Sequence, residues 1–346
     1  MLETIDKIKR EKKKRRMTKL YTFKLIAIFF VFIIIQIKDN NNGNSNDSMK
    51  LNYQQKIEDF QYKNFSILRR LSCPTCGIFS FFIVHLGCIK QYLSMGYIPI
   101  IDLQSFPNVY NKGNLSSANP WEFFFHQPFN YSLEEVLKYA KNIKYFECTL
   151  KTERPNENYI YNNKESLNFW HSFTKKYSPI KEELLGEAKA IMKELFGGTK
   201  NILGIIMRGT DYISRKPKGH SIPPKIEQVI VDVKMMDKKY KYDFIFFTTE
   251  DEIIKKKFIP HFKDKLKLLN PKVKIQYNYT GKSIINLNKD IYGNIEFFKN
   301  YVLNIIILSK CLDIVAARCS GTAGIFVLSE GFRNVIVYNN GTYYRI

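Results

Sequence analysis

The sequence predicts an α/β protein of two domains, with a parallel, doubly wound sheet in its second half. Between residues 202 and 338, short apolar runs typical of buried strands alternate with longer runs of helical spacing. Such alternation builds a parallel sheet with helices on both faces. At 346 residues, 45% of them hydrophobic, the chain is long enough for two domains and apolar enough to pack them.

The amino-terminal segment predicts a membrane anchor. Residues 1–19 are a basic tail, and residues 20–37 form an apolar run interrupted only by Tyr21, Thr22, Lys24 and Gln36. The run is short for a membrane-spanning helix, but no small-residue cleavage site follows it. We therefore favour an uncleaved signal anchor over a cleaved signal peptide or a buried helix. The tail would stay cytoplasmic, giving a single-pass type II membrane protein that faces the Golgi or another secretory lumen, or a membrane-associated protein in a bacterium.

A flexible stem and a first domain follow the anchor. Residues 38–57 begin with a polar, Asn-rich stretch and are expected to form the stem. The first domain covers 58–195. Ser132 is expected to begin a helix there, with Glu135 completing a capping box. The other elements expected in this domain are helix 81–95, strand 97–102, an aromatic turn at 119–126 and helix 182–196.

The second domain covers 196–346. Its expected strands are 202–207, 244–248, 274–277, 314–317 and 334–338, and its expected helices are 224–239, 251–258, 297–309 and 322–329. Ligands of a parallel sheet bind at the carboxyl ends of its strands. The residues that directly follow each strand are therefore the candidate functional residues.

Charge and cysteines narrow the classes of partner. The net charge is +22, which would attract a polyanion, a membrane surface or a phosphorylated ligand. No recognised nucleic-acid module accompanies it, so we do not expect nucleic-acid binding. Cys73 and Cys76 form a CxxC pair, but no second pair completes the four ligands of a structural zinc site. A disulfide and two reduced thiols both stay open.

The first candidate motif follows strand 202–207 and reads Arg208-Gly209-Thr210-Asp211. It places a cation, a flexible glycine and a hydroxyl at the end of a strand. The planar fork of an arginine suits a diphosphate because it donates two parallel hydrogen bonds. Asp211 could accept a proton from a sugar hydroxyl or hold Arg208 in place. The alternative is an Arg–Asp pair at a strand end without a ligand.

Two further motifs follow later strands. Residues 248–251 read Thr248-Thr249-Glu250-Asp251, and the alternative to a ligand site is a helix cap formed by Thr249. After strand 314–317 comes a turn of small residues that begins a helix and would offer backbone N–H groups to a phosphate. The members of this third motif are Arg318, Ser320, Gly321 and Thr322.

In this order and spacing the three motifs resemble the donor half of the fucosyltransferase superfamily, which includes the core α-1,6-, nodulation and protein O-fucosyltransferases and bacterial surface-glycan relatives. That family has H-x-R-R-T-D after a strand, then A-T-D-D, then a Ser-Ser turn. The stretch 216–220, which ends in His220, resembles the family's His-Pro-Ile, and the loop 73–80 with Gly77 resembles its Cys/Gly-rich loop. The resemblance implies a GT-B-like fold of two Rossmann-like domains, a GDP-sugar donor, GDP-fucose by default, and inversion. It implies no cofactor or metal.

Together the motifs and the resemblance make Arg208 and Asp211 candidate catalytic residues. The candidate donor-binding residues are Gly77, Arg208, Gly209, Thr210, His220, Thr248, Glu250, Asp251, Arg318, Ser320, Gly321 and Thr322. Trp121 and His126 are candidate acceptor-binding residues, because sugars stack on aromatic faces. His85 and the aromatic residues 123–125 are expected in the core.

The sequence departs from the family's pattern at four positions. Ile206 stands where the family has a His that helps hold the guanine, and Gly209 replaces a second Arg. Asn304 replaces an Asp that serves the base, and Lys216 lies near the position of a catalytic Glu. The function expected is transfer of a sugar from a GDP-sugar to a hydroxyl of a glycan or glycoprotein. The alternatives are a degenerate nucleotide- or carbohydrate-binding protein on this scaffold and a membrane-anchored polyanion-binding protein.

Overall fold

In the computed structural model of the chain, residues 58, 60–111, 118–156, 160–216, 218–269 and 292–344 are described. The chain divides into two compact units, Met1–Tyr62 and Lys63–Ile346. The basic tail, the expected anchor at 20–37, the expected stem at 38–57 and the expected strand 274–277 lie outside the described residues. Within the described residues, no helix has the length and apolar character needed to cross a membrane.

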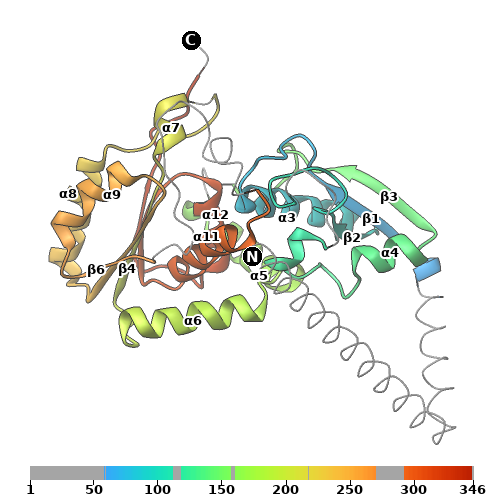
Figure 1. Cartoon of the computed structure of the whole chain (residues 1–346), viewed down its shortest axis with the longest axis horizontal. Coiled ribbons are helices and arrows are strands. Elements are labelled where there is room, and N and C mark those ends of the chain that lie inside the picture. The colour runs from blue at the N-terminus through green and yellow to red at the C-terminus, as the bar shows by residue number, and fades with distance from the viewer. Residues whose placement is uncertain are drawn as a thin grey trace, which may run out of the picture. The chain divides into compact units, whose positions relative to one another are not determined.

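The unit Lys63–Ile346 contains two parallel sheets, which confirms the α/β class (Figure 1). The first has the order β2-β1-β3, from β1 (Asn64–Arg69), β2 (Ile98–Ile101) and β3 (Asn142–Glu147). The second has the order β6-β5-β4-β7-β8. Its strands are β4 (Ile202–Met207), β5 (Phe244–Thr249), β6 (Leu266–Lys267), β7 (Asp313–Ala317) and β8 (Val335–Tyr338).

The strands of the second sheet are apolar on both faces because helices cover both. One face, with Ile202, Ile206 and Phe246, joins a large core that also contains residues of α6 (Glu182–Phe196), α11 (Ile295–Leu308) and α12 (Ser320–Leu328). The other face, with Leu203 and Ile205, packs against α8 (Ile226–Tyr240) and α9 (Glu252–Phe262). This arrangement confirms the doubly wound sheet that the strand–helix alternation predicts.

Helix boundaries follow local signals. Ser132 caps α4 (Leu133–Tyr139) and Glu135 completes the capping box, as expected. Helix α6 ends at Gly197, whose φ of 61° is the left-handed conformation that favours glycine. The other helices of the described residues are α3 (Ile78–Ser94), α5 (Lys164–Tyr177) and α7 (Thr210–Arg215), with short 3₁₀ turns at Pro120–Phe123 and Ile160–Asn162.

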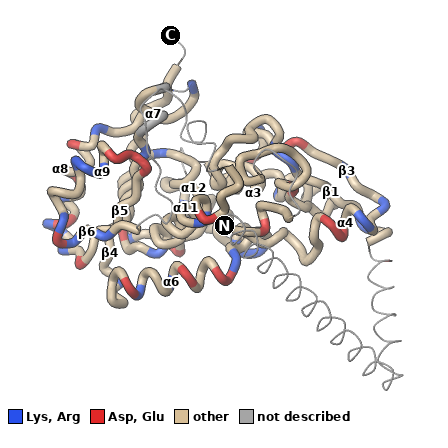
Figure 2. The backbone as a smooth tube through the Cα atoms, viewed as in Figure 1, with Lys and Arg blue, Asp and Glu red and all other residues tan. Residues whose placement is uncertain are grey.

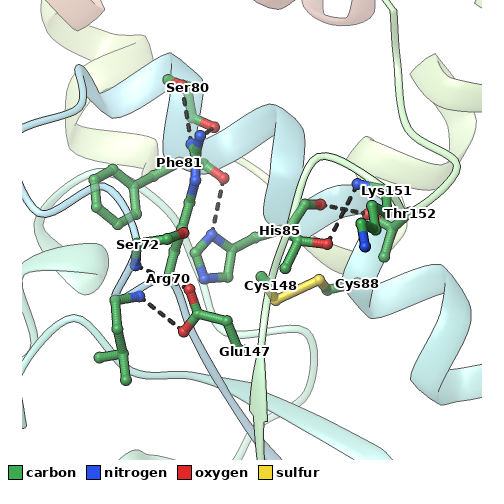
Figure 3. Close-up of a disulfide and its surroundings, with 12 residues drawn as sticks. Arg70, Ser72, Ser80, Phe81, His85, Cys88, Glu147, Cys148, Lys151 and Thr152 are labelled. Atoms are coloured by element: carbon green, nitrogen blue, oxygen red, sulfur yellow. Dashed lines mark hydrogen bonds between the residues drawn. A yellow bond between two sulfur atoms is a disulfide. The ribbon is translucent and has the colours of Figure 1, made fainter.

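The first sheet is joined to α3 by polar contacts and a disulfide (Figure 3). Cys88 of α3 bonds to Cys148, which follows β3, and Arg70 donates to the Ser80 carbonyl at 2.6 Å. Cys73 bonds to Cys76, so the CxxC pair is a disulfide. His85 is fully buried, and its Nδ1 lies 2.8 Å from the Phe81 carbonyl. This confirms that His85 is a core residue.

Candidate active site

The strand order of the second sheet places the three motifs at one edge. From β4 the chain continues outward through β5 and β6, then returns to β7 on the other side of β4 and ends at β8. Because all these strands are parallel, the segments that follow β4, β5 and β7 leave the same edge of the sheet. The reversal of direction between β4 and β7 is the point where doubly wound sheets bind their ligands.

Arg208 leaves β4 at this edge and is held from two sides. Its Nε lies 3.4 Å from Glu250 Oε1, and its Cζ lies 4.5 Å from the centre of the Tyr212 ring. Glu250 Oε1 also accepts the N–H of Gly209 at 3.0 Å. About a quarter of the Arg208 side chain stays exposed. Two of the predicted motifs thus meet through Arg208 and Glu250, which gives an oriented cation with access to solvent.

Asp251 belongs to the fold more than to the ligand surface. It is 2% exposed, and its Oδ1 accepts the N–H groups of Ile253 and Ile254 at the start of α9. Asp251 is therefore the N-cap of this helix, and the expectation that Thr249 caps it is wrong. Thr249 Oγ1 instead accepts the N–H of Asp251 at 3.1 Å. Because Asp251 Oδ1 already accepts these two N–H groups, it is not available to bind a nucleotide sugar.

Two side chains of the third motif are also engaged inside the protein. Arg318 donates to Asn339 Oδ1 at 2.6 Å and to the Gly341 carbonyl at 3.2 Å, which ties β7 to the segment after β8. Thr322 is buried and donates to the Ala317 carbonyl at 2.6 Å. These bonds engage two N–H donors of Arg318 and the Thr322 hydroxyl within the protein. What this turn offers is the backbone at Ser320 and Gly321.

Helix α12 begins at Ser320, and no side chain hydrogen bond caps it at Cys319. The N–H groups of its first turn point along the helix axis, where the helix dipole favours an anion. The start of α3 lies close by, because Phe79 packs against Gly324 so tightly that a Cβ there would stand 2.3 Å from the ring. Gly77, which precedes α3, is exposed and has open space around its Cα.

Tyr301 of α11 is a residue of this edge that the sequence reasoning missed. A Cβ at Gly321 would stand 2.2 Å from the Tyr301 hydroxyl, so this hydroxyl lies directly over the first turn of α12. Burial raises the pKa of Tyr301 well above its usual value, with nearby Cys319 acting the same way and Arg208 opposing it. Its place in an apolar helical run concealed it.

Other predicted residues lie near or away from this group. His220 is exposed and meets the Tyr212 ring edge-on at 5.0 Å, which extends the contact that begins at Arg208. Thr248 is half-buried and pairs with Ile206 across β5 and β4. Thr210 and Asp211 begin α7, but their side chains are not among those described. Asn304 donates to the Asn300 carbonyl at 2.9 Å within α11.

The two expected acceptor-binding residues, Trp121 and His126, differ in their exposure to solvent. Trp121 is fully buried and its Nε1 donates to the His126 carbonyl at 3.2 Å, so its ring offers no face to a sugar and that expectation is wrong. The His126 ring is partly exposed, with Nε2 2.8 Å from Glu182 Oε2. Phe124 and Phe125 are buried as expected, whereas Phe123 is 40% exposed.

The chain is similar to solved fucosyltransferase structures. NodZ α-1,6-fucosyltransferase soaked with GDP-fucose is 15% identical over 77% of this chain and 93% of that chain, with a TM-score of 0.44. Fucosyltransferase NodZ from Bradyrhizobium is 15% identical over 78% of this chain and 94% of that chain, with a TM-score of 0.45. POFUT1 in complex with GDP-fucose is 8% identical over 80% of this chain and 98% of that chain, with a TM-score of 0.43.

No protein-family model matches the chain, and no curated protein matches its sequence. The resemblance that the motifs predict is therefore found among solved structures alone. The chemistry of the site rests on its own residues.

Those residues suit a phosphorylated ligand. Arg208 supplies an oriented cation, and the start of α12 supplies N–H groups on the other side of the switch point between β4 and β7. Both stabilise negative charge. In the described part of the chain, no group of three His, Cys, Asp or Glu side chains could hold a metal ion.

Proposed function

We propose that this chain is a glycosyltransferase that moves a sugar, with fucose favoured, from a GDP-sugar to a hydroxyl of a glycan or glycoprotein, with inversion. The observation that carries the proposal is the position of Arg208 beside Glu250 and Tyr212 at the switch point of a parallel sheet, opposite the uncapped start of α12. A diphosphate needs such a cation and such N–H groups together.

The proposed mechanism relies on stabilising the leaving group. Arg208 and the backbone of residues 320–322 would stabilise the negative charge that develops on the diphosphate as the bond to the sugar breaks. A carboxylate, Asp211 in this proposal, would accept the proton of the acceptor hydroxyl. Because Arg208 supplies the positive charge, the proposed reaction needs no metal or cofactor.

The wider arrangement that we propose is GT-B-like. Residues 196–346 would bind the donor, residues 58–195 the acceptor, and the apolar run 20–37 would anchor the chain in a membrane with its body in a secretory lumen. The disulfides Cys73–Cys76 and Cys88–Cys148 support an oxidising compartment. Basic and acidic residues are interspersed along the described helices (Figure 2).

The test is release of GDP from GDP-fucose by the full chain, with and without EDTA, next to a UDP-sugar and a CMP-sugar. We expect GDP release above the uncatalysed rate that EDTA does not change. Release of UDP from the UDP-sugar, without release of GDP from GDP-fucose, would support a glycosyltransferase but contradict fucose as the transferred sugar. No release from any donor, with or without candidate acceptors, would contradict the proposal.

A catalytically degenerate binding protein is the second candidate. It is motivated by Ile206 and Gly209, which stand where the family has a His and a second Arg, and by the internal hydrogen bonds of the candidate donor-binding residues Arg318 and Thr322. Binding of GDP without turnover of any GDP-sugar would support this candidate over the transferase.

A further inference from the structure

Tyr301 contacts two neighbouring helices at the switch point. It belongs to α11, its hydroxyl lies over Gly321 at the start of α12, and its ring meets that of Phe79 from α3 edge-on at 5.8 Å. Arg208 after β4 and Glu250 after β5 are both close enough to affect its titration.

The Tyr301 hydroxyl is available for a ligand. The side chain is half-buried, and within the described part of the chain its hydroxyl forms no hydrogen bond. A tyrosine hydroxyl is protonated at neutral pH, and burial raises the pKa of Tyr301 further, so the phenol can donate a hydrogen bond. The hydroxyl is not one of the fully buried polar atoms that lack a partner, so it reaches the surface and can donate to an oxygen of a bound ligand.

Glycine at 321 is what lets this hydroxyl reach the helix backbone. Any larger residue would place its Cβ 2.2 Å from the Tyr301 oxygen and displace the ring. An anion bound between Arg208 and the N–H groups of α12 would therefore lie next to the phenol. Tyr301 adds a neutral donor where Arg208 and the helix start supply positive charge.

We propose that Tyr301 is a donor-binding residue, whose hydroxyl donates a hydrogen bond to a diphosphate oxygen of the nucleotide sugar. This inference rests on the proposed function, because it places the diphosphate at the switch point. It makes the phenol a recognition element for the phosphates and not for the base. Inorganic pyrophosphate should therefore report on it as well as GDP does.

The experiment is calorimetric titration of the full chain with GDP and with pyrophosphate, for the parent, Tyr301→Phe and Tyr92→Phe. Tyr92 is a matched control: it is buried, its pKa is raised by burial, and it stacks on Phe146 in the first sheet. We expect Tyr301→Phe to lower the affinity for GDP and the affinity for pyrophosphate by a similar factor, roughly tenfold or more. Tyr92→Phe should leave both affinities unchanged, and the unfolding temperature of ligand-free Tyr301→Phe should match that of the parent.

The outcomes separate this inference from the proposed function. If the parent binds GDP and pyrophosphate, and Tyr301→Phe binds them equally well, the inference is wrong and the donor site stands. If Tyr301→Phe lowers the affinity for GDP but not the affinity for pyrophosphate, the phenol contacts the guanosine part of GDP and not the phosphates, and the inference is again wrong. If the parent binds neither ligand, both proposals are overturned.

Discussion

Gly209 lies against the carboxylate of Asp251, so that a Cβ at residue 209 would stand 2.2 Å from Asp251 Oδ2. The residue after Arg208 is thus packed on the residue that caps α9. The family that the sequence resembles has a second Arg at this position, and here the space for such a side chain is filled by Asp251. The departure at Gly209 is therefore a consequence of local packing.

Gly209→Ala should destabilise the protein by about 1–3 kcal/mol, because the new methyl group forces Asp251 away from the start of α9. Gly186→Ala is the matched control, since Gly186 lies in α6 with nothing within 4 Å of its Cβ position. That change should raise the free energy of unfolding by up to about 1 kcal/mol. Urea unfolding of both variants checks this, and equal stability of the two would contradict the contact.

The free energy of unfolding should decrease as the pH is lowered, because His85 is buried in its neutral form. Burial lowers the pKa of His85 to about 4, while the unfolded side chain titrates near 6.5. Between these values the unfolded chain binds a proton that the folded chain does not, so the free energy of unfolding falls as pH falls. The loss should reach about 1.4 kcal/mol per pH unit.

The measurement is urea unfolding at several pH values from 7 to 5 for the parent and His85→Gln. The variant should show a shallower slope, although its stability at pH 7 is lower because a buried ring is lost. His261→Gln is the control, since His261 is exposed and its removal should keep the slope of the parent. A His85→Gln slope equal to that of the parent would show that His85 is not the titrating group.

The two disulfides should differ in their contribution to stability. Cys88–Cys148 closes a loop across a sequence separation of 60, whereas Cys73–Cys76 spans a separation of only 3. Chain-entropy arguments give about 4 kcal/mol for the first and about 2 kcal/mol for the second. Urea unfolding of two double variants measures both contributions to the free energy of unfolding. One variant carries Cys88→Ala and Cys148→Ala, and the other carries Cys73→Ala and Cys76→Ala. Equal losses, or a parent that a reductant does not destabilise, would contradict the pairing.

The parts of the fold that the sequence predicts are those with strong local signals. The bounds of α6 and β4 match the expected 182–196 and 202–207, because each has clear periodicity and α6 ends at a glycine. Strand β3 was missed because it is an edge strand with mostly exposed side chains and no apolar run. Its pairing with β1 depends on residues far away in the sequence.

The candidate site divides in the same way. Arg208 and Glu250 could be predicted, because each follows a recognisable strand and adjacent strand ends meet. The hydrogen bond from Arg318 to Asn339 could not be predicted, because it depends on how the segment after β8 returns to β7. Tyr301 is part of the site only because α11 packs beside α12, which no local pattern reveals.

Titration of GDP into the full chain and into Arg208→Ala tests whether Arg208 binds the diphosphate of a nucleotide sugar. Arg69→Ala is the matched control, because Arg69 also pairs with a carboxylate, Asp102 at 2.6 Å, and also stacks on a tyrosine, Tyr145 at 4.4 Å. We predict that Arg208→Ala weakens GDP at least ~10-fold, while Arg69→Ala binds like the parent. GDP binding of equal strength in the parent and in Arg208→Ala would contradict the account.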